Sequence, residues 1–167
     1  MAVYTITRFA ASDMDQADLL TLAASLETGS EHPLAEAIVE EAKKQNLTLA
    51  KVADFQAHSG QGVSGKVEGK TILLGNVSFM KHYEIDVGTQ LDKAQKLAGQ
   101  AKTPMYVAVE NQFAGIIAVA DPIKSDSKLA IQRLQAQGMK VIMLTGDNSA
   151  TAKAVADEVG IAEYHAE

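Results

Sequence analysis

The spacing of apolar and polar residues changes along the chain, and it predicts both helices and strands. Apolar residues recur at helical spacing in some stretches, while β-branched residues alternate with polar ones in others. The predicted helices in the first two thirds span 15–27, 33–45, 77–83 and 89–98. The predicted strands span 3–9, 51–57, 63–68, 71–74, 104–109 and 113–119, with hairpin turns at Glu68-Gly69 and around Asn111.

The pattern is different after Asp121-Pro122. The rest of the chain predicts a helix at 127–137, a continuous apolar strand at 140–144 that is typical of a buried parallel sheet, and a helix at 148–159. A glycine follows each of these helices, as at many helix ends. We therefore expect an α+β domain in residues 1–119, with an antiparallel sheet flanked by helices, and a partial α/β segment in residues 120–167.

Composition excludes several classes of function. The formal net charge of −6 argues against a general nucleic-acid or anionic-membrane binder. The absence of cysteine excludes a disulfide scaffold and any cysteine-based metal site. The longest apolar run, 113–120, is far shorter than the roughly 18 residues that a membrane span needs. The histidines lack the spacing of metal ligands, so we expect no metal site within the chain.

The stretch SEHPLAEAI, residues 30–38, places a histidine just before a predicted helix. An imidazole there is able to stack on a purine, and base–aromatic stacking is worth ~1–3 kcal/mol. Glu27 lies five residues before His32, where a carboxylate accepts a hydrogen bond from the adenine amine and repels the guanine carbonyl. The alternative is a surface histidine beside a helix-end charge. Ser30 is the expected N-cap of the helix.

Three further motifs carry candidate chemistry, each with a plainer alternative. Gly60 and Gly62 precede a strand and would let a backbone approach a ligand, or simply form a flexible turn. Asn76 follows a strand and is either a site residue or an N-cap. Thr145-Gly146-Asp147 joins an apolar strand to a helix, an arrangement that suits a phosphate but also suits an aspartate N-cap.

The order of these motifs is more informative than any one of them. Glu27, Ser-Glu-His-Pro-Leu, Gly-Gln-Gly-Val, Gly-Asn, Asp-Pro-Ile-Lys and Thr-Gly-Asp-Asn follow one another along nearly the whole chain. This series resembles the cytoplasmic ATP-binding region of heavy-metal-transporting P-type ATPases. The form of the His-Pro motif that contains Glu31 is most similar to the copper exporters.

The resemblance implies a role for each matching position. Glu27 and His32 would hold the adenine, with Gly60, Gly62 and Val63 along the adenine and phosphate side of the pocket. Asn76 would lie at the same cleft, near the ribose or as a brace. Thr145, Gly146 and Asp147 would belong to the phosphorylation domain, near the γ-phosphate and Mg²⁺. Asp121 would form the hinge between a nucleotide-binding domain, 1–119, and part of a haloacid-dehalogenase-like phosphorylation domain, 120–167.

Some features of that family are missing from the sequence. It contains neither the Asp-Lys-Thr-Gly-Thr motif of the phosphorylated aspartate nor the later Gly-Asp-Gly-x-Asn-Asp motif. We therefore expect a soluble fragment, the cytoplasmic part of an integral membrane protein, that binds ATP without turnover. In the intact pump, Mg²⁺ would assist transfer of the γ-phosphate to the aspartate.

The expected partners are adenine nucleotides, the remaining phosphorylation, actuator and membrane domains of the pump, and through the whole protein a metal chaperone. Nucleic acid is not an expected partner. Two alternatives stay open. One is a haloacid-dehalogenase-type phosphatase, which needs a nucleophilic Asp-x-Asp at a strand end, and we assign none here. The other is a non-catalytic docking module, which would leave the ordered series of motifs unexplained.

Overall fold

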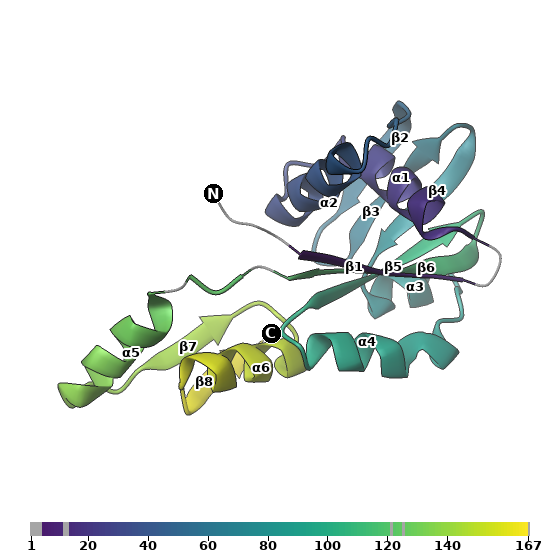
Figure 1. Cartoon of the computed structure of the whole chain (residues 1–167). Coiled ribbons are helices and arrows are strands. Elements are labelled where there is room, and N and C mark those ends of the chain that lie inside the picture. The colour runs from purple at the N-terminus through teal and green to yellow at the C-terminus, as the bar shows by residue number, and fades with distance from the viewer. Residues whose placement is uncertain (1–4, 12–13, 121, 125, 167) are drawn as a thin grey trace. The chain divides into compact units, whose positions relative to one another are not determined.

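The computed structural model describes residues 5–11, 14–120, 122–124 and 126–166 (Figure 1). These residues form two units. The larger unit contains Ile6–Leu91 and Pro104–Val119, and the smaller unit groups Asp92–Thr103 with the segment that begins at Ala120.

The larger unit is built on a six-stranded sheet with the order β1-β6-β5-β4-β3-β2. Its strands are β1 (Thr5–Ala10), β2 (Val52–His58), β3 (Gly62–Val67), β4 (Lys70–Gly75), β5 (Thr103–Val109) and β6 (Gln112–Ala120). The pairs β2–β3, β3–β4 and β4–β5 are antiparallel. This confirms the expected antiparallel sheet.

Two tight turns confirm the predicted hairpins. Glu68 and Gly69 join β3 to β4, and both have positive φ angles, of 51° and 79°. Glu110 and Asn111 join β5 to β6 with φ angles of 50° and 60°. Two successive positive φ angles are the signature of the type I′ turn, whose twist matches that of the flanking strands.

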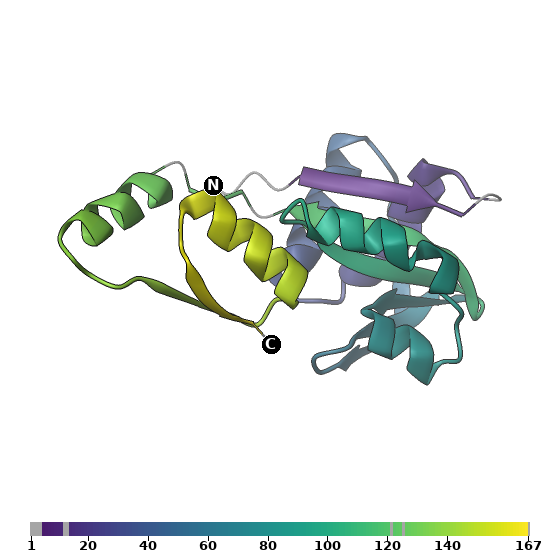
Figure 2. The same ribbon diagram turned by 90° about the horizontal axis from the view of Figure 1, so that it is seen from below.

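Helices cover both faces of this sheet (Figures 1 and 2). On one face, α1 (Gln16–Glu27) packs on β2, β3 and β4, and α2 (Pro33–Lys44) packs on α1. On the other face, the short helix α3 (Val77–His82) packs on β4. Because both faces are covered, β4 and β6 contain runs of consecutive buried residues instead of alternating ones.

The core of the larger unit lies between α1 and the sheet, with a second layer under α3. Phe79 of α3 is completely buried. Other fully buried large side chains are Leu19, Leu20, Leu26, Ile38, Ile72, Ile116 and Ile117. Truncation of a buried phenylalanine costs about 3–5 kcal/mol, so we expect the stability to be sensitive to substitution of Phe79.

The smaller unit is an α/β arrangement. After the single-turn helix η1 (Gly88–Gln90), its elements are α4 (Leu91–Ala98), α5 (Ser127–Ala136), β7 (Ile142–Thr145), α6 (Ser149–Val159) and β8 (Glu163–Ala166). Strands β7 and β8 are parallel. Helix α6 packs on β8 and α5, around a small core of Ala156, Val159 and Ile161. Gly160 ends α6 in the left-handed conformation, as predicted.

The expectation that residues 140–144 form a buried strand is wrong in one respect. The strand is parallel to its neighbour, but Leu144 is 80% exposed and Ile142 is 40% exposed. Among the described residues this sheet has only two strands, so little covers Ile142 and Leu144. The sequence also failed to predict β8, because Glu-Tyr-His-Ala has neither alternation nor an apolar run.

Candidate functional site

The turn between α1 and α2 presents the predicted histidine. His32, and not Ser30 as expected, is the N-cap of α2, since its Nδ1 accepts a hydrogen bond of 3.2 Å from the amide of Leu34. Ser30 supports the histidine instead, by accepting a hydrogen bond of 3.3 Å from its amide. Pro33 occupies the first helical position, where its missing N–H is not needed. An accepting Nδ1 leaves the ring proton on Nε2.

Glu27 ends α1 and is buried, with only 5% of its surface exposed. Burial raises the pKa of Glu27 to about 7, and a hydrogen bond with the Ser30 side chain offsets only part of this rise. Its Oε2 atom is buried without a hydrogen-bond partner. A buried acceptor that is left unpaired costs about 1–3 kcal/mol, so this oxygen is a place where a ligand donor would stabilise the protein.

Glu27 and His32 border the same hollow, which has a volume of about 260 Å³. Its lining consists of Glu27, Thr28, Ser30, Glu31, His32, Glu36 and Val39. This volume lies just below the usual range for small-molecule sites, so it suits one flat ring system better than a whole nucleotide. Three of the lining residues are acids, so the hollow repels phosphate groups and favours a ligand that donates hydrogen bonds. An adenine base fits both conditions.

Asn76 braces the predicted glycine turn. Its Nδ2 donates to the carbonyl of Gly60 at 2.9 Å, and its backbone amide donates to the carbonyl of Gln61 at 2.8 Å. Its Oδ1 accepts from the amide of Phe79 at 2.9 Å and so caps α3. Gly60 has a φ angle of +69°, which glycine adopts without strain. The side chain of Asn76 therefore both caps α3 and holds the glycine turn in place.

The packing of the sheet explains why residue 62 is a glycine. A β-carbon there would lie 2.3 Å from the carbonyl oxygen of Leu74 and 2.8 Å from the ring of Phe79. Val63 follows on β3 and pairs with Leu74. All residues that line the hollow come from 27–39, so the glycine turn and Asn76 form a second group in the larger unit.

The Thr-Gly-Asp motif lies in the smaller unit. Thr145 Oγ1 donates to Asp147 Oδ2 at 3.0 Å and accepts from the Asp147 amide at 3.1 Å. Asn148, not Asp147, caps α6. One carboxylate is only part of a magnesium site, and no group of three or more histidine, aspartate and glutamate side chains able to hold a metal occurs in the described part of the chain. The predicted hinge, Asp121, lies outside the described residues.

One motif was overlooked in the sequence. Asp13-Met14-Asp15 is an Asp-x-Asp sequence that follows the first strand, as the phosphatase alternative requires. Asp13 is not among the described residues. Asp15 caps α1 by accepting a hydrogen bond of 3.1 Å from the Ala17 amide, and the strand before it, β1, is an edge of the six-stranded sheet instead of a neighbour of β7. Strands β1 and β7 therefore belong to different sheets.

A second hollow, of about 320 Å³, lies beside α3. Its lining consists of Val77, Lys81, Glu84, Ile85, Asp86, Val87, Gly88 and Leu91. None of the predicted site residues belongs to this set.

Comparisons with known proteins agree with the resemblance. A family profile for haloacid dehalogenase-like hydrolases matches residues 3–167. A copper-transporting P-type ATPase of Rhizobium leguminosarum bv. viciae is 46% identical over 149 residues, which are 89% of this chain and 18% of the relative. A copper-exporting P-type ATPase of Bacillus subtilis is 43% identical over 153 residues, which are 92% of this chain and 19% of the relative. The chain thus spans about a fifth of the length of these relatives.

Solved structures show the same fold. A zinc-transporting PIB-type ATPase in its E2.Pi state matches with a TM-score of 0.73 and 32% identity, over 98% of this chain and 26% of that one. The catalytic domain of the CPx-ATPase CopB-B, from a study of its changes upon nucleotide binding, matches with a TM-score of 0.68 and 25% identity, over 98% of this chain and 55% of that one. These matches confirm the predicted fold class and the resemblance to heavy-metal P-type ATPases.

No helix in the described ranges is long and apolar enough to cross a membrane. The sequence profile, the copper-transporting relatives and the solved pump structures all agree over most of the chain. This chain belongs to the haloacid dehalogenase-like hydrolase family and is homologous to the catalytic region of heavy-metal-transporting P-type ATPases.

Proposed function

We propose that this chain is the ATP-binding region of a copper-exporting P-type ATPase. Residues 1–119 are its nucleotide-binding domain, and residues 120–167 are part of its phosphorylation domain. A boundary after residue 119 is supported by the two units, since Pro104–Val119 belongs to the larger one and the segment from Ala120 to the smaller, although the smaller unit also includes Asp92–Thr103, which lies within 1–119. The domain holds the adenine of ATP so that the γ-phosphate is transferred to an aspartate elsewhere in the pump.

The observation that carries this proposal is the unpaired Oε2 of Glu27 beside the hollow. The adenine amine is a hydrogen-bond donor, and the buried oxygen is an acceptor that lacks one. Binding of adenine would therefore remove an existing penalty as well as form a contact. Guanine has a carbonyl oxygen at the same place, which the ionised carboxylate repels.

His32 supplies a platform for the base. Its Nδ1 is engaged with the amide of Leu34, so the ring is held at the start of α2 and its orientation does not have to be fixed when a ligand arrives. A base stacked on it gains ~1–3 kcal/mol. Glu27 and the imidazole together recognise the edge and the face of one ring system.

The phosphates extend away from the hollow. Glu31 and Glu36 line it together with Glu27, and this acidic lining repels the phosphate chain. We therefore propose that the base supplies most of the affinity. Thr145, Gly146 and Asp147 serve the γ-phosphate end in the whole pump, where Mg²⁺, when bound, neutralises phosphate charge. The remaining pump domains, and a metal chaperone acting through the whole protein, are the other proposed partners.

Calorimetric titration with AMP, ADP and ATP tests this proposal. The three affinities should agree within about threefold, because the base carries the interaction. His32→Gln should weaken AMP binding by about tenfold or more, since stacking is lost. His82→Gln is the matched control, because His82 is an exposed histidine on α3 that lines neither hollow. A hundredfold preference for ATP, or equal affinities of the two variants, would overturn the proposal.

A further inference from the structure

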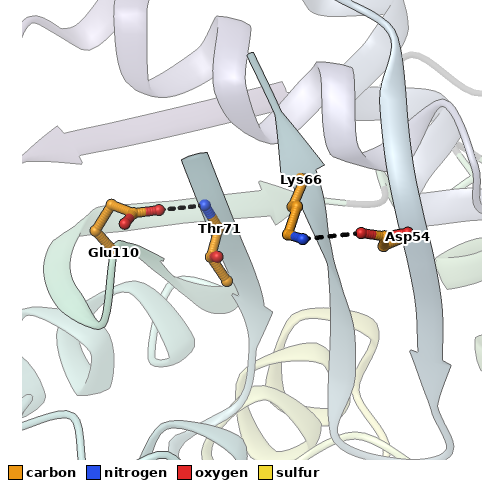
Figure 3. A network of polar contacts seen from close by, with 4 residues as sticks. All are labelled: Asp54, Lys66, Thr71 and Glu110. Atoms are coloured by element: carbon orange, nitrogen blue, oxygen red, sulfur yellow. Dashed lines mark hydrogen bonds and ion pairs between the residues drawn. The ribbon is translucent and has the colours of Figure 1, made fainter. Parts of the chain in front are cut away.

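Strand β2 contains a bulge next to the site. Ala53 pairs with Lys66 and Gln56 pairs with Ser64, so β2 has one residue more than β3 between these two pairs. Asp54 lies in the bulge with a φ angle of +52°. Its carboxylate forms an exposed ion pair of 3.0 Å with Lys66 on β3 (Figure 3).

The extra residue changes which side chains of β2 face α1. Val52 pairs with Val67 and Ala57 pairs with Val63. Both partners lie on the α1 face of β3, because they are two residues from Gly65, where a β-carbon would point at Leu26 of α1. A regular strand would place residues 52, 54 and 56 on one face. With the bulge, Val52 and Phe55 lie on the same face although they are three residues apart. Bulges commonly redirect a side chain in this way.

Phe55 uses this orientation to contact the turn after α1. A β-carbon at Gly29 would lie 2.8 Å from both Cγ and Cδ2 of Phe55 and 3.2 Å from its Cδ1. Gly29 has no positive φ angle, so an alanine there is disfavoured by the ring and not by its backbone conformation. Gly29 lies between Glu27 and Ser30, in the turn that presents the hollow.

A second contact ties β2 to the same end of α1. The hydroxyl oxygen of Ser25, which is fully buried, accepts a hydrogen bond of 2.9 Å from the amide of Ala50, two residues before β2. The last turn of α1 and the start of β2 are therefore held together. Phe55 itself is not among the residues that line the hollow.

We propose that Phe55 is a positioning residue for base recognition, and that its ring against Gly29 fixes the turn that carries Glu27 and His32. The inference rests on the proposed nucleotide function, and it adds a residue that touches no ligand. Glycine at position 29 lets the ring approach the backbone, and the bulge directs the ring there. The relative placement of Glu27 and His32 then follows from packing against β2.

Four variants test the contact between the ring of Phe55 and Gly29. Phe55→Ala removes the ring, and Gly29→Ala pushes the turn away from it, so each should weaken AMP binding by about tenfold. Phe55→Leu should bind AMP nearly as well as the wild type, because leucine retains Cγ and both Cδ atoms, which are the atoms that approach Gly29. The double variant Gly29→Ala/Phe55→Ala should recover much of the affinity, because the added methyl group occupies space that the ring has left.

Gly99→Ala is the matched control, since a β-carbon there would make only ordinary contacts of 3.5 Å. The ratio of AMP to GMP affinity is measured for every variant, because a general loss of stability does not change it. Phe55→Ala and Gly29→Ala should lower this ratio, and the double variant should restore it. Additive losses in the double variant, or an unchanged ratio in both single variants, would overturn the inference.

Amide NMR spectra without nucleotide separate this inference from the proposed function. The amides of Ser30, Glu31 and His32 should move in each single variant and return towards their wild-type positions in the double variant. If the amides move in the single variants and return in the double variant, but the wild type binds no AMP, the nucleotide function is wrong and the positioning role stands. If the amides do not move in the single variants, the positioning role is wrong whether or not AMP binds.

Discussion

Asn76 connects the glycine turn to α3, because its side-chain nitrogen donates to the carbonyl of Gly60 and its side-chain oxygen accepts from the amide of Phe79. Both bonds are 2.9 Å long. One amide group thus satisfies an acceptor in a turn and a donor at a helix start. An ionised carboxylate, which only accepts, would replace just one of these two functions.

Variants of Asn76 should separate the two bonds. Asn76→Ala loses both and should lower the free energy of unfolding by about 1–2 kcal/mol, the usual effect of losing a cap. Asn76→Asp keeps the acceptor for Phe79 but has no donor for Gly60, so its stability should lie between those of the wild type and the alanine variant. Urea unfolding measures the order. Equal stability of the aspartate and alanine variants would mean that the helix cap contributes nothing.

The stability of the protein should depend on the ionisation of Glu27. Its pKa is about 7 in the folded protein against an ordinary value of 4.5, so the folded state binds the proton more tightly than the unfolded state. The contribution is fully present below about pH 4.5 and is lost as the pH rises through about 7. The loss amounts to roughly 3 kcal/mol at most.

Urea unfolding of the wild type and Glu27→Gln between pH 4.5 and 8 measures this dependence, because glutamine does not ionise. The wild type should lose stability relative to the variant over this interval and level off above it. Glu158→Gln is the control, since Glu158 is an exposed acid on α6. Parallel curves for the wild type and Glu27→Gln would show that Glu27 ionises normally.

Base selectivity should also depend on pH. Ionised Glu27 accepts from the adenine amine and repels the guanine carbonyl, whereas the protonated acid is a donor for that carbonyl. The ratio of AMP to GMP affinity should therefore rise as the pH increases through about 7. Fluorescence competition or calorimetry at several pH values measures the ratio. A ratio independent of pH would mean that Glu27 does not contact the edge of the base.

The exposed side chain of Leu144 on β7 should contribute little to stability in this chain. Leu144 is 80% exposed, so Leu144→Ser should change the free energy of unfolding by no more than about 0.5 kcal/mol. Leu74→Ala is the comparison, because Leu74 is buried in β4 and its truncation should cost about 2–5 kcal/mol. Thermal unfolding of both variants checks this. A large effect of Leu144→Ser would contradict the observed exposure of β7.

Local chemistry explains what the sequence predicted well. Glu68-Gly69 and Asn111 mark turns that depend on a few adjacent residues, and both hairpins are present. Contacts distant in the sequence explain what it missed. The need for glycine at position 62 comes from the carbonyl of Leu74 and the ring of Phe79. The bulge that turns Phe55 towards Gly29 depends on the pairing of β2 with β3.

The candidate site shows the same division. Its residue types and their order were sufficient to suggest base recognition by Glu27 and His32, which line one hollow. The sequence could not predict that Oε2 of Glu27 lacks a partner, because burial depends on the packing of α1 and α2. It also could not predict that His32 replaces Ser30 as the cap, since either side chain is able to accept that bond.

Titration of the labelled wild-type chain with AMP, followed by amide NMR, shows whether the hollow between α1 and α2 binds the base. The resonances that shift should belong to this hollow, with those of Glu27, Ser30 and His32 moving most. The hollow beside α3, which Lys81 and Asp86 help to line, should remain unchanged and serves as an internal control. Shifts confined to that second hollow would contradict base binding between α1 and α2. The absence of any shift at several millimolar AMP would contradict it as well.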